Sequence, residues 1–570
     1  MVYLTLLALG AILILWYLYD RFVQREHTLL INYPVIGRLR YLFEAVREPF
    51  RQYFGDEDIF DSRDKIEWVY KAARDKTNFI SFSPSNPQKN PKFMLRHAFA
   101  PLNDHEVSSD FSVTFGEDCA YPFHAASVIC RSAMSDGSIS PEGTQAFAIG
   151  ARRGGFPINT GEGGLTTNFL VTHRSYDERY MQIVPLKAHQ ILLFKAARRL
   201  FNTAFAINLL KPIALPQGME DTYIFDREKM CFYRIDWDAP LDAFPRSVPD
   251  DVADIVLQIG SGLYGVRDSE GNFDPQRYQK VMRFCRMTEI KLAQGAKQTG
   301  GKLTKNKVTD AVAYYRGVTP HQDLFSPNRF PYARSVSELF DFIEKLKGLS
   351  QKPVGFKTIL SDREGFVPIA RELKKRIAQN RPIPDFITID GGEGGSATAP
   401  IELMERVGLG IKDALYLADE ILREEGVRSR IRLIAGGKVL TPDNVVILLA
   451  LGADMVAIAR GFMMSAGCIR ARVCSGADGH HCPVGLATQD RTKRKAYIVH
   501  KYAQMIENYH RNMRKNIRMI LAVMGIEKID RLDKSDLLLV DENGYIHNDI
   551  RRYLDHKYDD RVERREPALL

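Results

Sequence analysis

The chain has 570 residues, of which 45% are hydrophobic and 26% are charged, a composition typical of a globular protein large enough for more than one domain. The net charge of +9 arises from 79 basic and 70 acidic residues spread along the chain, and no basic cluster with interleaved aromatics indicates nucleic-acid binding. Seven cysteines, an odd number, argue against a disulfide framework and favour a reducing compartment.

The first twenty residues differ from the rest of the chain. Residues 2–19 carry no charge, and a helix of this length would span about 27 Å, near the thickness of bilayer hydrocarbon. We therefore expect a single-pass transmembrane anchor at residues 1–20. The positive-inside rule places the rest of the protein in the cytoplasm, because the run is followed by Arg21, Arg25, Arg38 and Arg40. A cleaved signal peptide is the alternative, but the expected flanking basic and small residues are missing.

Residues 21–110 form a mixed polar and aromatic segment, expected to be a helical and irregular extension. Across residues 111–490, short β-branched runs end repeatedly in glycine-rich turns. There are eight such runs, at 127–140, 154–164, 254–265, 289–297, 353–360, 386–397, 431–440 and 455–462. Several are separated by helix-like segments. This rhythm predicts an α/β fold, a (β/α)8 barrel that binds ligands at the C-terminal ends of its strands. A doubly wound open sheet is the alternative. Residues 491–570 are expected to form a helical extension and tail.

A long interval separates the second run from the third. It covers roughly ninety residues, far more than a usual βα loop, and predicts an insertion at about 166–250. Residues 190–211 within it are amphipathic in helical register and include Lys195, Arg198 and Arg199. Two interpretations stay open: an extra helix packed on the barrel, or an interfacial contact with a membrane.

Glycine-rich turns indicate where a phosphorylated ligand would bind. One strand ends in Gly436 and Gly437, and a helix begins near Thr441, a pattern that barrels use to bind phosphate between their last two strands. FMN is the best candidate, because Lys357 ends another strand and could stabilise negative charge on a reduced flavin. A structural ion pair is the alternative role for Lys357. Residues 260–265 fit the dinucleotide pattern G-x-G-x-x-G, but no helix pattern follows, so we reject that interpretation.

Three cysteines lie close together in the sequence. Cys468, Cys474 and Cys482 are separated by five and seven residues, a grouping typical of metal or iron–sulfur ligands. Three thiolates suit a three-iron cluster, or a four-iron cluster closed by another ligand. A zinc site completed by His480 or His481 is an alternative, although zinc usually takes a tight C-x-x-C pair. A chance grouping of buried cysteines is the third possibility.

Five ordered motifs resemble the FMN-binding synthase domain of glutamate synthase. They are "SAMSDGSIS" (132–140), "NTGEGG" (159–164), "KLAQGAK" (291–297), "DGGEGGSA" (390–397) and "CPVGLATQD" (482–490). The apolar start followed by residues 37–54 resembles the stand-alone FMN-binding glutamate synthase family proteins. The likeness runs from about residue 110 to 535.

The resemblance implies a barrel that binds FMN beside an iron–sulfur cluster, with a three-iron cluster favoured over a four-iron one. It implies an oxidoreductase of the CH–NH2 class that converts 2-oxoglutarate and ammonia, through 2-iminoglutarate, to L-glutamate. The positions matching those that contact FMN are Met134, Ser135, Thr160, Glu162, Lys357, Gly391, Gly392, Gly436 and Gly437. Gln294, Lys297 and Arg316 match the positions that bind the dicarboxylate, for which two cations and an amide are suited. Lys297, which could polarise the carbonyl or imine, and Glu162 are expected to be catalytic.

The chain departs from the family pattern in three places. The family spaces its cysteines by five and then four residues, and it has an acidic residue after "GAKPG", where this chain reads "GAKQTGGKL". No amidotransferase domain precedes the barrel, so ammonia is expected from solution or from an ammonia-donating partner. The expected electron donor is a ferredoxin-like protein or a membrane redox partner. Two other functions stay open: the same chemistry on another 2-oxo or 2-amino acid, and a non-catalytic membrane flavoprotein scaffold.

Overall fold

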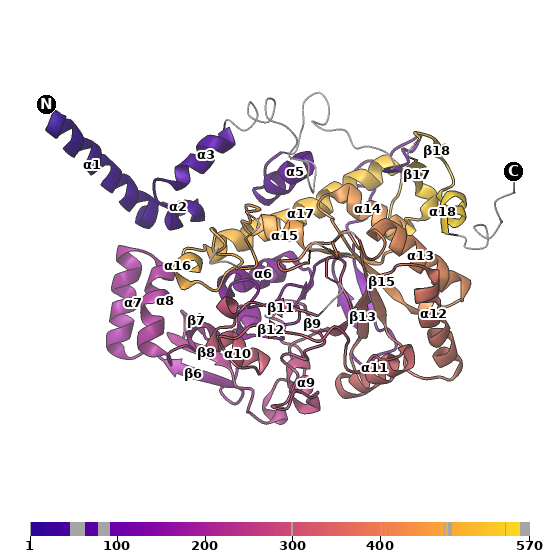
Figure 1. The fold of residues 1–570 in the computed structure, drawn as a ribbon, viewed down its shortest axis with the longest axis horizontal. Helices are drawn as coiled ribbons and strands as arrows, with labels where there is room; N and C mark the ends of the chain where they lie inside the picture. Colours follow the sequence, from indigo (N-terminus) through magenta and orange to yellow (C-terminus); the bar gives the residue numbers. More distant parts are fainter. Residues whose placement is uncertain are drawn as a thin grey trace.

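The computed structural model describes residues 2–45, 63–77, 92–297, 300–400, 402–404, 406–471, 473–476, 481–541 and 543–558. Its centre is a closed barrel of eight parallel strands (Figure 1). The strands are β4 (Ile129–Arg131), β5 (Ile158–Asn159), β9 (Ile255–Ile259), β10 (Met287–Lys291), β13 (Val354–Thr358), β14 (Phe386–Asp390), β15 (Arg432–Gly436) and β16 (Met455–Ile458). Seven of them lie within the predicted runs and β10 overlaps the run at 289–297, so the predicted (β/α)8 barrel is confirmed.

Helices connect the barrel strands and pack around the outside of the barrel (Figure 1). They are α6 (Pro141–Gly154), α9 (Pro275–Met282), α10 (Asp310–Arg316), α11 (Val336–Ser350), α12 (Arg363–Ala378), α13 (Ile411–Glu424), α14 (Pro442–Ala450) and α15 (Arg460–Ser465). Side-chain oxygens of Ser140, Asp274, Ser335 and Asp362 cap α6, α9, α11 and α12 by accepting hydrogen bonds from first-turn N–H groups. Such caps fix where each helix begins, and therefore where each loop ends.

A hairpin closes the N-terminal end of the barrel. Strands β2 (Val113–Phe115) and β3 (Phe123–Ala125) pair in antiparallel fashion below the strands. The Phe115 ring meets the Phe386 ring edge-on at 5.7 Å and joins an apolar cluster with Met287 and Met455 inside the barrel. Because this end is filled with side chains, ligands have access from the C-terminal end, as is usual for the fold.

The segment between β5 and β9 forms a substructure with its own apolar cluster. An antiparallel sheet of β6 (Met181–Pro185), β8 (Cys231–Ile235) and β7 (Ile224–Asp226) packs against the helix pair α7 (Ala188–Leu200) and α8 (Thr203–Ala214). Phe194 of α7 and Phe232 of β8 are both buried in this cluster. The amphipathic residues 190–211 therefore form two helices that pack on a small sheet, not one helix on the barrel.

The chain ends lie outside the barrel. The 26-residue helix α17 (Val499–Met524) packs on α6 and on α5 (Arg63–Ala73). Strand β1 (Lys92–Leu95) pairs with β17 (Leu537–Val540), which pairs with β18 (Ile546–His547). The remaining elements are α2 (Thr28–Asn32), α3 (Gly37–Ala45), β11 (Lys302–Leu303), β12 (Leu324–Phe325), α16 (Arg491–Arg494) and α18 (Ile550–Tyr558).

The predicted transmembrane anchor is wrong. Within the described residues the structure contains no helix with both the length and the apolar character needed to span a membrane. Helix α1 (Val2–Leu18) has 17 residues and ends before Asp20. A π-helical turn follows it, and the buried Asp20 in that turn pairs with Arg38 at 2.5 Å. The single-pass location predicted from this anchor is therefore wrong as well.

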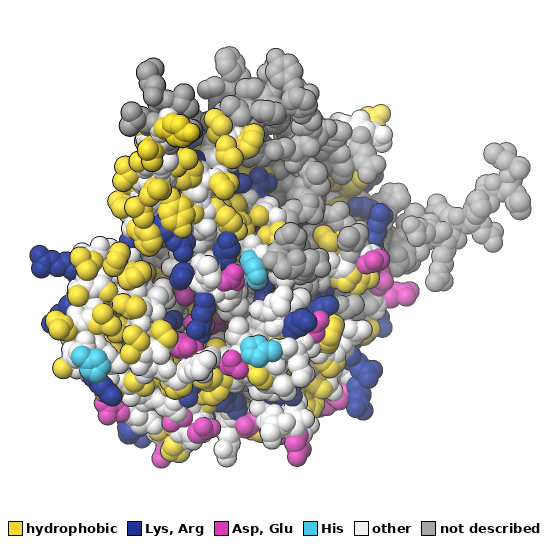
Figure 2. All heavy atoms as spheres, turned by 60° about the vertical axis from the view of Figure 1, so that its left-hand side comes forward, with side chains coloured by type: hydrophobic (Ala, Val, Ile, Leu, Met, Phe, Trp, Pro, Cys, Tyr) yellow, Lys and Arg dark blue, Asp and Glu magenta, His cyan; other side chains and the backbone are white. Residues whose placement is uncertain are grey.

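An apolar surface nevertheless covers the side of the molecule formed by α1 and the α7–α8 pair. Figure 2 shows hydrophobic side chains gathered over α1 and over the α7–α8 pair. Leu7 and Leu15 of α1, and Leu192 and Leu200 of α7, are all more than half exposed. The rings of Phe22 and Phe201 lie 6.4 Å apart, so the N-terminal segment contacts the α7–α8 pair.

Candidate active site

A cavity of about 1400 Å³ opens at the C-terminal ends of the barrel strands. Most of the predicted site residues line it: Met134, Ser135, Glu162, Gln294, Lys297, Arg316, Lys357, Gly436, Gly437, Cys468 and Cys474. Four predicted residues do not line it, namely Thr160, Gly391, Gly392 and Cys482. The cavity thus brings together side chains that lie more than 300 residues apart in the sequence.

Glu162 lies among three cations. Its carboxylate pairs with Lys291 at 2.8 Å, and Lys297 and Arg316 act on it through their charges. Burial alone would raise the pKa of Glu162, but the hydrogen bond from Lys291 and the three positive charges lower it below its ordinary value. Glu162 is therefore ionised at neutral pH and able to accept a proton or a hydrogen bond.

Lys297 and Arg316 are buried cations that face the cavity from different elements. Lys297 follows β10 and donates to Thr398 Oγ1 at 2.9 Å, and burial, with the charge of Lys291, lowers its pKa to about 8. Arg316 ends α10 and donates to Ser135 Oγ at 3.2 Å, while its Nε has no hydrogen-bond partner. The turn that holds Gln294 and Lys297 is closed by a hydrogen bond from Lys297 N to Gln294 O, at 3.0 Å. These groups form a positively charged wall suited to a carboxylate ligand.

Lys357 takes part in an ion pair at the end of the barrel. Its Nζ lies 3.1 Å from Asp390 Oδ1, and both side chains line the cavity. Burial opposes the charge on Lys357, but Asp390 and Glu289 raise its pKa above the ordinary value, so it is a cation. The ion-pair role is therefore realised, and it leaves Lys357 positively charged at the position proposed for a flavin.

A layer of polar side chains around Glu289 lies inside the barrel, below the cavity, and was not predicted from the sequence. Glu289, which is buried, accepts hydrogen bonds from Asn159 Nδ2 at 2.8 Å and Gln258 Nε2 at 2.7 Å. Thr388 Oγ1 donates to its second oxygen at 2.5 Å. Thr160 also helps to tie β5 to β9, because its Oγ1 accepts from Gln258 N at 2.9 Å. This use of Thr160 explains why its side chain does not line the cavity.

Glycines allow the loops to approach one another at the rim. Gly161 has φ +65°, and a Cβ there would lie 2.6 Å from Ser135 N, so the "NTGE" turn packs directly on the end of β4. A Cβ on Gly295 would lie 1.6 Å from Gly391 O. The N–H of Gly391 donates to Gly436 O at 2.8 Å, and that of Gly392 to Leu409 O at 2.8 Å. Gly391 and Gly392 therefore connect the turns around the cavity through backbone hydrogen bonds and do not line the cavity themselves.

Gly295→Ala should be strongly destabilising, because its Cβ would overlap the Gly391 carbonyl and force the two turns apart. We expect a loss of about 3 kcal/mol in the free energy of unfolding, measured by urea denaturation. Gly348→Ala is the matched control, since it lies on an exposed face of α11 with no atom within 4 Å of the added Cβ. That change should stabilise the protein by about 0.5–1 kcal/mol. Equal stability of the two variants would contradict the close approach of the turns.

The three predicted metal-binding cysteines are neighbours in the structure. Burial raises the pKa of the Cys468 thiol to about 12, and the nearby thiols of Cys474 and Cys482 add to the effect. Lys307, which is 3% exposed, donates to Cys474 O at 2.7 Å. Within the described residues no group of three His, Cys, Asp or Glu side chains is arranged to hold a metal ion. The zinc alternative thus gains no support from these residues, and His480, its other candidate ligand, lies outside them.

Several residues that line the cavity were not predicted from the sequence. Lys291 and Asp390 are the last residues of β10 and β14, and a polar residue at the C-terminal end of a barrel strand is a signal that could have identified both. Lys307 carries no such signal, because it follows an irregular loop and becomes significant only through its contact with Cys474.

Residues 86–527 match the conserved region of glutamate synthase, so the chain belongs to the glutamate synthase family, a family of oxidoreductases, as its motifs predicted. It is 30% identical to the glutamate synthase large subunit-like protein YerD of Bacillus subtilis, covering 95% of both chains. It is also 30% identical to the archaeal-type glutamate synthase [NADPH] of Thermotoga neapolitana, over 50% of this chain and 53% of that one. The glutamate synthase [NADPH] large chain of Bacillus subtilis matches at 31% identity, over 53% of this chain and 19% of that much longer protein.

A solved structure of a mutant flavocytochrome b2 with pyruvate bound aligns with 90% of this chain and 90% of its own. The TM-score is 0.40 and the sequence identity 12%, a likeness too low to bear on function.

Proposed function

We propose that this protein reductively aminates 2-oxoglutarate to L-glutamate, using FMN seated in the large cavity. The observation that carries the proposal is the arrangement of Lys291, Lys297 and Arg316 around the Glu162 carboxylate, on the wall of a cavity that also contains Lys357 and the Gly436–Gly437 turn. Family membership supports this choice over other cationic pockets.

The residues at the end of β15 fit a flavin phosphate. Gly436 and Gly437 leave the backbone open to the cavity, and α15 begins at Arg460, directly after β16. Backbone N–H groups at such positions favour phosphate oxygens. Lys357, as a buried cation, would stabilise negative charge on the ring system. When bound, FMN would supply the electron pair that reduces the imine.

The cationic wall fits a dianionic 2-oxo acid. Lys297 and Arg316 would pair with its carboxylates, and the Gln294 amide would donate a further hydrogen bond. Lys297 could also polarise the carbonyl or imine during reduction. Glu162 is ionised and adjacent to these cations, so it would accept a proton as ammonia adds to the carbonyl carbon.

The three cysteines would hold an iron–sulfur cluster at the edge of the same cavity, since their thiols are neighbours and the buried Lys307 would offset the cluster's negative charge. A ferredoxin-like protein would be the electron donor. No helix begins within residues 260–265, the segment that fits the dinucleotide pattern; α9 starts only at Pro275, which supports a donor other than a nucleotide bound there.

Binding of 2-oxoglutarate should weaken as the pH rises through about 8. Lys297 carries its positive charge below its pKa of about 8 and loses it above that value, so its attraction for a carboxylate is present at neutral pH and lost in alkali. The dissociation constant, followed from the flavin spectrum across this range, should increase with pH. A pH-independent constant would show that Lys297 does not contact the ligand.

A spectral titration tests the proposed substrate. Purified protein reconstituted with FMN should show a saturable change in flavin absorption with 2-oxoglutarate, and a weaker one with oxaloacetate or pyruvate. A response to another 2-oxo acid, with none to 2-oxoglutarate, would move the assignment to that acid.

A further inference from the structure

Residues 20–44, which we call the brace, contact the part of the chain that carries the three cysteines. Four of the five residues of α2 are buried, and α3 packs on this helix. The buried Asp20 holds the brace in shape, because it accepts hydrogen bonds from Val35 N at 2.9 Å and from Arg38 Nε at 3.1 Å. None of these contacts enters the proposed function.

The brace supports the residue that precedes the first cysteine through a tyrosine ring. Thr28 Oγ1 and Tyr502 Oη lie 2.6 Å apart and share a hydrogen bond, and both residues are more than 90% buried. Tyr502 packs directly on Gly467, where φ is +93° and an added Cβ would lie 2.4 Å from the ring. Among the described residues, Thr28 is the hydrogen-bond partner of the Tyr502 hydroxyl. Thr28 therefore fixes the ring that supports the backbone just before Cys468.

The brace contacts the residue that follows the last cysteine directly. Asn32 Nδ2 donates to Pro483 O at 2.9 Å and to Lys493 O at 3.0 Å. The two carbonyl groups fix the orientation of the amide, because its oxygen would be repelled by both. Thr28 and Asn32 are the first and last residues of α2. One short helix therefore holds the backbone at both ends of the run from Cys468 to Cys482.

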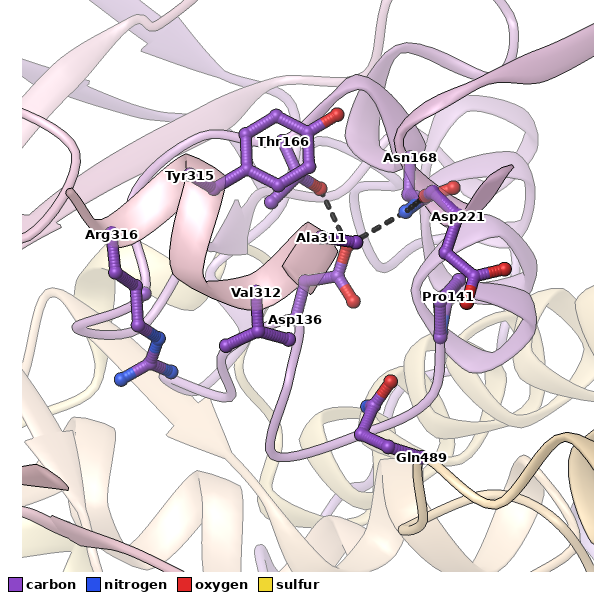
Figure 3. A pocket seen from close by; sticks show the side chains of 11 residues that line it. Asp136, Pro141, Thr166, Asn168, Asp221, Ala311, Val312, Tyr315, Arg316 and Gln489 are labelled. Carbon is purple, nitrogen blue, oxygen red and sulfur yellow. Dashed lines mark hydrogen bonds between the residues drawn. The ribbon is translucent and has the colours of Figure 1, made fainter. Parts of the chain in front are cut away.

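Other contacts fasten this part of the chain to the barrel. Gln489 Nε2 donates to Ile139 O at 2.8 Å, in the loop after β4. Figure 3 shows Gln489 at the edge of a small pocket that Asp136 of the same loop also lines. Lys307 donates to Cys474 O at 2.7 Å. The cysteine-bearing run is thus fastened to the barrel at these points and to the brace at its two ends.

The brace also forms part of the wall of the large cavity. Leu29 of α2 and Phe43 of α3 line the cavity together with Cys468 and Cys474. Leu29 is 8% exposed and Phe43 is 59% exposed, so this wall extends from a buried position to the molecular surface. Displacement of the brace would open the cysteine side of the cavity to solvent.

The spacing of the cysteines indicates what the brace contributes. Seven residues separate Cys474 from Cys482, where the family pattern has four. A longer loop has more conformations to lose when its cysteines bind one group, and fixing its ends reduces that loss. We propose that Thr28 and Asn32 are positioning residues for the cysteine-bearing run, and that the brace closes the cysteine side of the large cavity. The inference rests on the proposed function for the group that the cysteines bind.

Alkylation of the metal-free full chain with iodoacetamide, followed at each cysteine by mass spectrometry, tests the brace. Thr28→Val leaves the buried Tyr502 hydroxyl without its partner, and Asn32→Asp turns an oxygen toward two carbonyl groups. Each change should raise the labelling rates of Cys468 and Cys482 about tenfold, because a run that has lost a buried hydrogen bond opens more often.

Two other variants and two other cysteines serve as controls. Thr28→Ser keeps the hydroxyl and should restore the wild-type labelling rates. Asn516→Asp adds the same charge at a partly buried asparagine whose amide donates within α17, and should have no effect. Cys119 and the fully buried Cys285 lie outside the run, and their rates should stay unchanged in every variant.

Iron retention provides a second readout. With the iron–sulfur cluster assembled, Thr28→Val should lose iron to a chelator about tenfold faster than Thr28→Ser, for the same reason. Unchanged labelling of Cys468 and Cys482 in both test variants would overturn the inference. An equal rise at Cys119 and Cys285 would also overturn it, since Thr28 and Asn32 would then stabilise the whole fold.

The two proposals can fail separately. If the wild-type chain binds iron and forms glutamate, but the test variants label at the wild-type rate, the inference fails and the proposed function stands. If the variants label faster at Cys468 and Cys482 but the wild-type chain holds no iron, the brace stands and the cluster in the proposed function fails.

Discussion

Replacing Lys297 with alanine is expected to lower kcat/KM for 2-oxoglutarate by about 10²- to 10³-fold. Lys297 is 5% exposed, and its ammonium group faces the large cavity beside Lys291 and Glu162. Its removal would take away a buried positive charge from the place where a carboxylate or a developing negative charge would lie. The measurement is steady-state turnover with a reduced donor, together with the flavin spectral titration.

Lys302→Ala is the matched control for this prediction. Lys302 lines the same cavity, but its side chain is 43% exposed and lies 3.8 Å from Asp323. A charge so well solvated contributes little to binding, so the control should retain most of its activity. If Lys297→Ala and Lys302→Ala lose activity equally, the cavity attracts its ligand through overall charge and Lys297 has no specific role.

Glu162→Gln is expected to lower kcat by about 10²- to 10⁴-fold, the usual contribution of a general acid or base. The amide keeps the shape of the side chain but cannot accept a proton, and it leaves Lys291 without its partner at 2.8 Å. FMN content should fall much less than turnover, because Lys357 and the Gly436–Gly437 turn are untouched, although Glu162 also matches a position that contacts FMN. Turnover and bound flavin, measured on the same preparation, separate these two effects.

Glu393→Gln provides the comparison, because Glu393 is the corresponding glutamate of the other glycine-rich turn. Its carboxylate accepts from Ile411 N at 2.9 Å and so anchors the start of α13. This change should affect thermal stability more than turnover. A larger loss of turnover from Glu393→Gln than from Glu162→Gln would reverse the roles given to the two glutamates.

The barrel could be predicted from the sequence because its strands are short and mostly apolar, and most of them are followed by a glycine-rich turn. Those signals are local, and the eight runs coincide with the eight strands. The same local reasoning was wrong for residues 1–20, where hydropathy suggested a membrane span. The helix ends at Leu18, and Asp20 is buried through its contact with Arg38, a pairing between distant residues that hydropathy does not report.

The candidate site was predictable where its residues lie in strand-end motifs. Glu162, Lys297 and Lys357 belong to such motifs, and all three line the cavity. The sequence did not show which of the two glutamates lies among the cations and which anchors a helix, since "NTGEGG" and "DGGEGG" look alike.

The most direct test of the central proposal is the reoxidation of the reduced protein by its substrates. The FMN-loaded chain, reduced with dithionite without oxygen, should recover its yellow flavin absorption when 2-oxoglutarate and ammonium are added together, with one L-glutamate formed for each flavin reoxidised. Neither compound alone should produce this change. A flavin that stays reduced in the presence of both, or that reoxidises without forming glutamate, would contradict the proposed function.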